Sequence, residues 1–178
     1  MNEIIQIQEK YERLHTKHFW EDVIFSYQWW FLLILTIVLW IIWIVLVDKK
    51  RLQNIVMIGL LTSLIALLLD DIGYSMALWN YPYYLVPFSS TQTSIDLAII
   101  PVSYMLLYQY FRKWKSYLIA LTLITLFAVF VVESLFVKLG IYVLVRWELW
   151  YAVPIYILIG ILVKSLVDKI EKRSEEQS

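Results

Sequence analysis

Residues 70–108 read DDIGYSMALWNYPYYLVPFSSTQTSIDLAIIPVSYMLLY, and the interpretation of the whole chain depends on this stretch. Two carboxylates, Asp70 and Asp71, end one long apolar run, and Asp96 opens the next. Between them lies an uncharged loop rich in aromatic residues. Charges beside apolar runs of membrane-spanning length are costly and often functional, so these acids and the loop are the first candidates for a site.

The composition of the chain is that of a membrane protein. Of its 178 residues, 61% are hydrophobic and 17% are charged, whereas soluble domains contain about 45–50% apolar and about 25% charged residues. Acidic and basic residues number 15 each, which gives no electrostatic reason to expect a nucleic-acid partner. Cysteine is absent, which excludes disulfides, thiol catalysis and thiolate metal sites.

The apolar runs predict an all-α fold: an integral membrane bundle of five transmembrane helices with an N-terminal amphipathic interfacial helix. In residues 1–27, apolar side chains recur at three- and four-residue steps, as in a helix that lies at the membrane surface. Crossing the hydrocarbon takes about 20 apolar residues. Within a transmembrane domain over residues 28–167, the predicted spans are 29–47, 52–74, 96–111, 116–137 and 148–167, followed by a charged, frayed cytoplasmic tail over 168–178.

Two residues inside the predicted spans carry specific expectations. Pro101 lacks a backbone N–H, so it leaves a carbonyl of its helix for a neighbour to satisfy. Lys164 lies near the end of the fifth span and is expected to extend its ammonium outward to the interface. The side chains of Pro101, Tyr104, Tyr108 and Phe111 share one side of the third span, which helix packing explains.

Basic residues predict the orientation in the cell membrane. Ten of the fifteen Lys and Arg residues lie in three regions, 49–51, 112–115 and 164–173, and five lie in the alternate regions. Because cytoplasmic loops carry an excess of Lys and Arg, the N-terminus and the aromatic loop are expected outside and the C-terminus in the cytoplasm.

Counting along the helices places the acids near the outer end of the bundle. Asp70 lies about 27 Å beyond Leu52 at 1.5 Å per residue, near the edge of a hydrocarbon core about 30 Å thick. Asp70, Asp71 and Asp96 are therefore expected at the outer rim. Glu133 has the same depth but is followed by more apolar residues, so it is the carboxylate expected inside the hydrocarbon.

An acidic and aromatic layer at the outer side is the candidate ligand-binding site. Converging carboxylates could bind a cation or share protons, and aromatic rings beside them could hold an organic cation. Alternatively, the acids face water at helix ends, the aromatic residues form an interfacial belt, or Arg146 and Lys138 pair with the acids. The candidate residues are Asp70, Asp71, Asp96, Glu133, Trp79, Tyr81, Tyr104 and Trp147.

A zinc site could also be drawn from Glu12, His15, His18 and Asp22, which recur at helical spacing. A charged helix surface produces the same pattern without a metal. The sequence therefore predicts no metal site and no cofactor.

A weak internal repeat relates the second and third spans to the fourth and fifth. Similar outer-leaflet chemistry explains the repeat as well as duplication does; a duplication would place a site at the interface of the two halves. In order, Asp70, Gly73, Tyr74, Trp79, Asp96, Pro101 and Tyr104 correspond to Glu133, Gly140, Tyr142, Trp147, Glu148, Pro154 and Tyr156.

Over residues 50–167 the order of motifs is W-x-Y-P from Trp79, D-x4-P-x2-Y from Asp96, YQYF from Tyr108, then Glu133, G-x-Y from Gly140, and Trp147. This order resembles an uncharacterised family of small multi-pass membrane proteins of Gram-positive, often spore-forming, bacteria. The resemblance implies a helical plasma-membrane protein and brings no assigned activity or catalytic residue. In layout alone, the chain also resembles small membrane cyclases that act on isoprenoids.

Three functions follow as hypotheses. The favoured one is a non-enzymatic protein of the lipid bilayer that binds a small apolar or cationic ligand, or a helix of a membrane-protein partner, at the acidic and aromatic layer. The second is an enzyme that acts on a lipid or isoprenoid, with a carboxylic acid as proton donor. The third is a proton- or cation-coupled carrier, although no acid at the midplane or on the cytoplasmic side completes a path.

Overall fold

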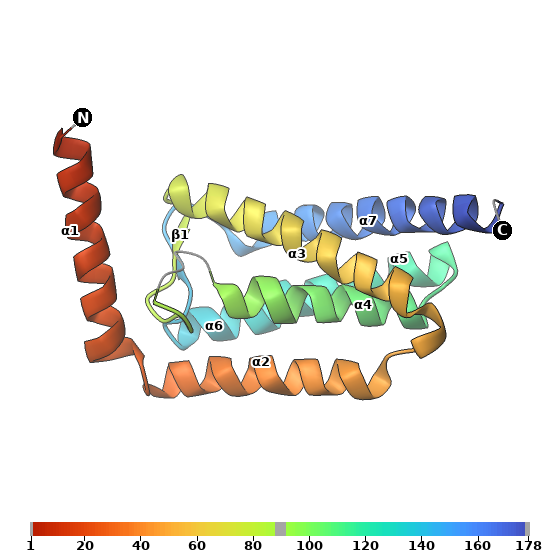
Figure 1. The fold of residues 1–178 in the computed structure, drawn as a ribbon, viewed down its shortest axis with the longest axis horizontal. Helices are drawn as coiled ribbons and strands as arrows, with labels where there is room; N and C mark the ends of the chain where they lie inside the picture. Colours follow the sequence, from red (N-terminus) through yellow and green to blue (C-terminus); the bar gives the residue numbers. More distant parts are fainter. Residues whose placement is uncertain (1, 88–91, 177–178) are drawn as a thin grey trace.

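The computed structural model describes residues 2–87 and 92–176 (Figure 1). It is helical apart from one pair of two-residue strands, which confirms the predicted all-α class. Four helices are long and apolar enough to cross a membrane, as expected of an integral membrane protein: Tyr27–Leu46, Lys49–Ser75, Trp114–Lys138 and Leu149–Ser174.

The helices and strands of the described residues follow one another along the chain in a simple order. In order they are α1 (Asn2–His18), a π-helical segment (Phe19–Val23), α2 (Tyr27–Leu46), a 3-10 turn (Lys49–Arg51), α3 (Leu52–Ser75), β1 (Trp79–Asn80), a π-helical segment (Ile95–Ile99), α4 (Ile100–Tyr110), α5 (Trp114–Phe127), a π-helical segment (Ala128–Glu133), α6 (Ser134–Lys138), β2 (Val143–Leu144), a 3-10 turn (Leu149–Tyr151) and α7 (Ala152–Glu175).

The five predicted spans are not all confirmed, because the third is short. The apolar helix there covers Ile95–Tyr110, about 24 Å at 1.5 Å per residue, less than the hydrocarbon thickness of about 30 Å. The long loop before it and the charged residues after Phe111 limit its length. At the other end of the chain, α7 continues as helix to Glu175, past residue 168 where the frayed tail was expected.

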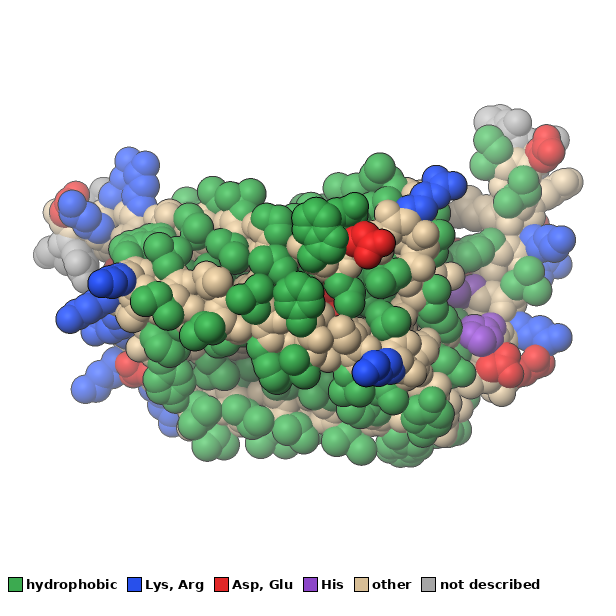
Figure 2. Space-filling model, turned by 180° about the vertical axis from the view of Figure 1, so that it is seen from behind, with side chains coloured by type: hydrophobic (Ala, Val, Ile, Leu, Met, Phe, Trp, Pro, Cys, Tyr) green, Lys and Arg blue, Asp and Glu red, His purple; other side chains and the backbone are tan. Residues whose placement is uncertain are grey.

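The helices form a bundle in which α3, α4, α5 and α7 enclose the core. Figure 1 shows α2 lying along one side of this bundle, and the N- and C-termini at its two opposite ends. Figure 2 shows, from behind, apolar side chains over the middle of the molecule and Lys and Arg side chains gathered at the end far from α1. The largest core cluster includes Ile55, Ile58, Met105, Tyr108, Tyr117, Leu121 and Ile159.

The N-terminal helix α1 crosses the end of the bundle at a steep angle to the other helices (Figure 1). Its apolar residues Ile4, Ile7 and Leu14 are exposed, as expected for a helix whose apolar side faces lipid at the interface. The chain then turns into α2, whose first turn is capped by Ser26: the Trp29 backbone N–H donates to Ser26 Oγ at 3.2 Å.

Two loops meet at the end of the bundle near α1. The helices before them end alike, with the Leu78 N–H donating to the Gly73 carbonyl at 3.0 Å and the Ile141 N–H to the Phe136 carbonyl at 2.9 Å. The chain then forms β1 and β2, which pair antiparallel with Trp79 opposite Leu144. This pairing was not predicted, because two-residue strands leave no periodic pattern in a sequence.

The backbone carbonyl that Pro101 leaves without its helical donor accepts a hydrogen bond from a neighbouring helix, as the sequence predicts. Pro101 cannot donate to the Leu97 carbonyl four residues earlier, and the Trp40 indole N–H donates to that carbonyl instead, at 3.2 Å. The indole thereby holds α2 against the start of α4.

The expectation that Lys164 extends outward is wrong. Its side chain is buried, with a relative exposure of 2%, and its Nζ donates to Asp168 Oδ2 at 2.9 Å. The same ammonium lies about 5 Å from the ring centroids of Tyr108, Trp114 and Tyr117. The counter-charge one helical turn away and the three rings stabilise a charge that would otherwise move to the interface.

Candidate functional site

A cavity of about 250 Å³ lies between α3, α4, α7 and the segment that joins α5 to α6. It is near the end of the bundle where β1 pairs with β2. Of the eight candidate residues, only Asp71 does not line it, because that side chain is exposed on another face of α3. The structure brings seven together there: Asp70, Asp96, Glu133, Trp79, Tyr81, Tyr104 and Trp147.

Asp70 is buried and receives hydrogen bonds from the loop that follows α3. Trp79 Nε1 and the Tyr81 hydroxyl donate to its Oδ1 at 2.8 and 2.6 Å, and the Gln92 backbone N–H donates to its Oδ2 at 3.2 Å. Both carboxylate oxygens are thus satisfied by three donors on the loop. Asp70 ties this loop to α3 and holds it over the cavity.

Asp96 lies in the π-helical segment before α4, with a relative exposure of 3%. Its carboxyl group is in hydrogen-bonding contact with that of Asp70. Two carboxylates in contact repel each other unless a proton or a cation lies between them. Within residues 2–87 and 92–176, Asp96 Oδ2 has no hydrogen-bond partner.

The alternative that Asp70 and Asp96 face water is therefore wrong. Both are more buried within the protein than Glu133. Residue counting gives the depth along the membrane normal, but it does not show that the aromatic loop folds back over the helix ends. The exposed positions of Asp71 and Glu148 agree with acids that face water.

Glu133 lines the cavity from the end of the π-helical segment Ala128–Glu133. Its Oε1 accepts a hydrogen bond from the Tyr156 hydroxyl at 2.7 Å. The Tyr104 hydroxyl in turn donates to the Tyr156 backbone carbonyl at 2.6 Å, which joins α4 to α7. Both Asp96 and Glu133 thus lie in π-helical turns, which are frequent at functional sites.

Aromatic rings from both loops form one wall of the cavity. The rings of Trp79 and Trp147 meet edge to face at 5.0 Å between centroids, and those of Tyr81 and Tyr142 stack at 5.4 Å. Burial and the nearby Asp70 carboxylate raise the pKa of Tyr81 well above its ordinary value. Tyr81 therefore keeps its proton and remains a donor to Asp70.

No lysine or arginine of the described chain lines this cavity. The alternative in which Lys138 or Arg146 pairs with the acids is wrong, since both side chains are exposed and neither forms an ion pair in the described residues. The loops carry these two side chains to the surface. The three carboxyl groups that line the cavity thus have no cationic side chain beside them among the described residues.

Three contributors to the site were missed by the sequence reasoning. A Cβ at Gly73 would lie 2.1 Å from the Trp79 ring, so glycine is what lets the indole lie against α3 and reach Asp70. Tyr142 and Tyr156 also line the cavity. Tyr156 is the repeat counterpart of the candidate residue Tyr104, so the repeat could have identified it, whereas the counterpart of Tyr142 is Tyr74, which does not line the cavity.

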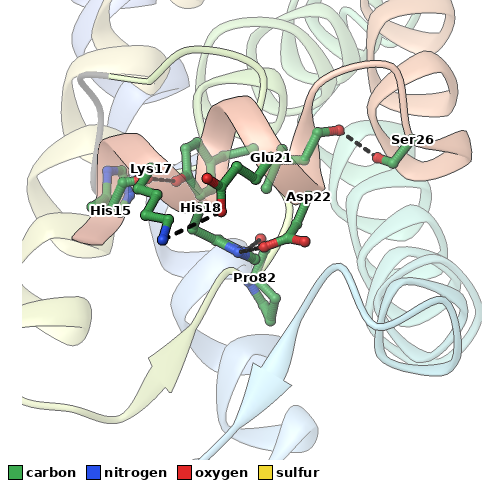
Figure 3. A network of polar contacts seen from close by, with 9 residues as sticks. His15, Lys17, His18, Glu21, Asp22, Ser26 and Pro82 are labelled. Atoms are coloured by element: carbon green, nitrogen blue, oxygen red, sulfur yellow. Dashed lines mark hydrogen bonds and ion pairs between the residues drawn. The ribbon is translucent and has the colours of Figure 1, made fainter. Parts of the chain in front are cut away.

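The N-terminal segment contacts the aromatic loop through its two histidines (Figure 3). His18 Nδ1 lies 2.9 Å from Asp22 Oδ2, and its Nε2 lies 3.1 Å from the Pro82 carbonyl oxygen. The His15 ring stacks on Tyr84 at 4.4 Å, and the Tyr84 hydroxyl donates to the His15 carbonyl at 2.9 Å. These contacts hold α1 on the loop that covers the cavity.

Burial shifts the pKa values of two side chains at this contact. Burial lowers the pKa of His15 below its ordinary value of 6.5 and raises the pKa of Tyr84 to about 12. The alternative zinc set does not assemble: in the part of the chain that the structure describes, no three His, Asp or Glu side chains are grouped to hold a metal ion.

The fold and the site together define a helical integral membrane protein with an acidic, aromatic cavity near one end of its bundle. Comparisons with protein-family models, curated proteins and solved structures find no match to this chain. The resemblance to small multi-pass membrane proteins of Gram-positive bacteria stays a prediction.

Proposed function

We propose that this protein binds a small cationic or apolar ligand in the cavity and performs no chemistry on it. The observation that carries the proposal is the convergence of three carboxyl groups and several aromatic rings on one space that no cationic side chain of the described chain enters. A volume of about 250 Å³ is below the range of about 300–1,000 Å³ typical of drug-sized ligands, which favours a small molecule.

We further propose that the cavity lies at the outer leaflet. In this topology α4 and the π-helical segment before it form a fifth, short span, the N-terminus is outside and the C-terminus is cytoplasmic. The concentration of Lys and Arg at the end of the bundle far from α1 supports this orientation (Figure 2).

Native mass spectrometry of the gently extracted protein tests the ligand proposal. We expect a co-purified small molecule on the wild-type chain that is lost from Glu133→Gln and from Asp70→Asn. Asp71→Asn is the matched control, because this neighbouring acid is exposed and does not line the cavity. Equal occupancy in all four proteins, or an empty wild-type protein, would contradict the proposal.

One observation favours a second candidate, an enzyme that acts on a lipid or isoprenoid. The contacting carboxyl groups of Asp70 and Asp96 could hold a proton beside an apolar, aromatic-walled space, as acid catalysis on an alkene requires. A membrane lipid profile that is identical with and without the gene would argue against it. A carrier has less support, because Lys164 and Asp168, toward the other end of the bundle, already neutralise each other.

A further inference from the structure

We infer that the turn between α2 and α3 and the turn between α4 and α5 form one binding surface for the headgroup of an anionic phospholipid. This basic surface comprises residues 48–51 and 111–115. It lies at the end of the bundle far from α1, opposite the end that holds the cavity (Figures 1 and 2). The inference therefore does not depend on the ligand proposed for the cavity.

The basic surface carries a concentrated positive charge. Its two segments contain one acid, Asp48, and six basic residues: Lys49, Lys50, Arg51, Arg112, Lys113 and Lys115. All of the basic side chains except that of Arg51 are exposed, and none of the six forms an ion pair in the described residues. The neighbouring part of α7 differs, because acids of the same helix pair with Lys164 and Lys172. The charge of the two turns is thus available to a partner.

The Gln109 side chain holds the two turns side by side. Its Oε1 accepts a hydrogen bond from the Asp48 backbone N–H at 2.9 Å, and its Nε2 donates to the Leu46 carbonyl at 2.8 Å. The Arg51 guanidinium lies 4.9 Å from the ring centroid of Tyr108, at the same junction. The tertiary structure thus joins two groups of charge that lie far apart in the sequence.

Joining these groups favours a partner that contains phosphate. Like charges on adjacent turns repel each other, and only salt screens them where acids are scarce. Phosphate oxygens accept charge-assisted hydrogen bonds from lysine and arginine side chains and neutralise their charge. Figure 2 shows Lys and Arg side chains gathered at this end of the molecule. The surface is therefore complementary to an anionic headgroup.

Exposed apolar side chains beside the basic residues select a lipid over a soluble anion. They lie at the ends of α2, α3, α4 and α5, three of which belong to helices long and apolar enough to cross a membrane. They are Leu46, Leu52, Tyr110, Trp114 and Leu118. Tyr and Trp are typical of headgroup depth. A phospholipid brings a phosphate and acyl chains together, whereas inorganic phosphate or a nucleotide would leave the aliphatic side chains uncovered.

Retention of lipids by the full-length protein tests the inference. The protein is reconstituted in vesicles of equal parts palmitoyl-oleoyl phosphatidylglycerol and palmitoyl-oleoyl phosphatidylcholine, which share acyl chains and differ in net charge. After gentle extraction, native mass spectrometry counts the lipids that stay bound. We expect phosphatidylglycerol to exceed phosphatidylcholine at least about fivefold, the effect of one basic residue near an anionic membrane surface. Equal retention of the two lipids would overturn the inference.

Variants locate the preference on the protein. Lys50→Gln with Arg112→Gln removes one charge from each turn, and we expect it to reduce the preference to less than about half. Lys138→Gln with Arg146→Gln is the matched control, because it removes one exposed, unpaired Lys and one such Arg at the other end of the bundle. We expect the control to keep the wild-type preference. An equal loss in the two double variants would contradict the assignment to these turns.

Gln109→Ala tests whether the two turns act together. This change keeps every charge but removes both hydrogen bonds that join the turns, so we expect a weaker preference for phosphatidylglycerol. An unchanged preference would overturn the claim of a single surface. Because the exposed Lys50 and Arg112 can be changed without disturbing the core, their double variant remains a test if Gln109→Ala fails to fold.

A comparison of buffers distinguishes a lipid headgroup from a soluble anion. Lipid retention is measured in sodium phosphate and in sodium chloride at equal ionic strength, which screens the charges equally. We expect the same preference in both buffers. A lower preference in phosphate would show that inorganic phosphate competes for the basic surface, and it would overturn the assignment to a phospholipid.

Discussion

Single atoms decide how the cavity is closed, and Gly73 is the clearest case. The Trp79 ring occupies the space that any side chain at Gly73 would need. The indole can therefore reach Asp70, and the loop after α3 is drawn over the cavity. Adding one methyl group at this position therefore tests how the loop after α3 is held over the cavity.

We expect Gly73→Ala to destabilise the protein by about 1–3 kcal/mol, the usual cost of overpacking, and to break the Trp79–Asp70 hydrogen bond. Thermal unfolding in detergent and tryptophan emission measure the two effects. Gly140→Ala is the control: no atom lies within 4 Å of its added Cβ, but its φ of 71° is strained for alanine, so we expect a loss of about 1 kcal/mol and unchanged emission. Equal effects of the two changes on emission would contradict the role of Gly73.

Lys164 shows the same dependence on surroundings at the other end of the bundle. We expect Lys164→Met to destabilise the protein by about 2 kcal/mol, less than the loss of a fully buried pair, because the Asp168 side chain keeps 31% of its exposure. Lys172→Met, which breaks an exposed pair at 4.0 Å, is expected to change stability by less than about 0.5 kcal/mol.

A double-mutant cycle with Asp168→Asn checks how the Lys164 effect divides. A coupling free energy of about 1 kcal/mol or more assigns the effect to the ion pair. A coupling near zero would instead assign it to the rings of Tyr108, Trp114 and Tyr117.

At the scale of elements, we expect the position of α1 to depend on pH. Burial lowers the pKa of His15 in the docked helix, while an undocked α1 has the ordinary value of 6.5. The undocked state therefore binds more protons at low pH, so docking is complete above that value and weakens as pH falls through it. Glu12 and His18 are the charged neighbours that act on His15, in opposite directions.

We expect the distribution of distances between spin labels at Glu9→Cys and Val145→Cys to broaden as the pH is lowered from about 8 to about 5, the range in which histidine titrates. The cysteine-free chain makes this labelling specific. His15→Phe keeps a ring on Tyr84 but cannot titrate, so it should abolish the change, whereas His18→Gln should keep it. The same broadening in His15→Phe would exclude His15 as the titrating group.

For the whole molecule, the proposed five-span topology requires the short helix Ile95–Tyr110 to cross the membrane. If it does, residue 113 is cytoplasmic; if it enters and returns, residue 113 lies on the same side as the aromatic loop. We expect an impermeant thiol reagent added to intact cells to label Val145→Cys and Glu9→Cys but not Lys113→Cys or Lys172→Cys. Labelling of Lys113→Cys from outside would contradict the five-span arrangement.

The internal repeat can also be compared with the structure of the whole molecule. Trp79 meets Trp147, β1 pairs with β2, and the corresponding acids Asp70 and Glu133 line the same cavity. The cavity lies between the two segments that the weak repeat would relate, where a parallel repeat would place a site. The correspondence fails at Glu148, which is exposed while Asp96 is buried, and holds again at Tyr104 and Tyr156, which both line the cavity.

The sequence by itself determined the membrane class, the course of the four long helices and the choice of Asp70, Asp96, Glu133 and their aromatic neighbours. These features follow from local physics, because the length of an apolar run and the cost of a charge beside it are properties of the chain. Only the tertiary structure decided that Asp70 and Asp96 are buried and in contact, that Lys164 is enclosed by rings, and that one oxygen of Asp96 has no partner in the described residues. Those outcomes depend on how loops fold back and which side chains meet across helices, and no periodicity along the chain encodes them.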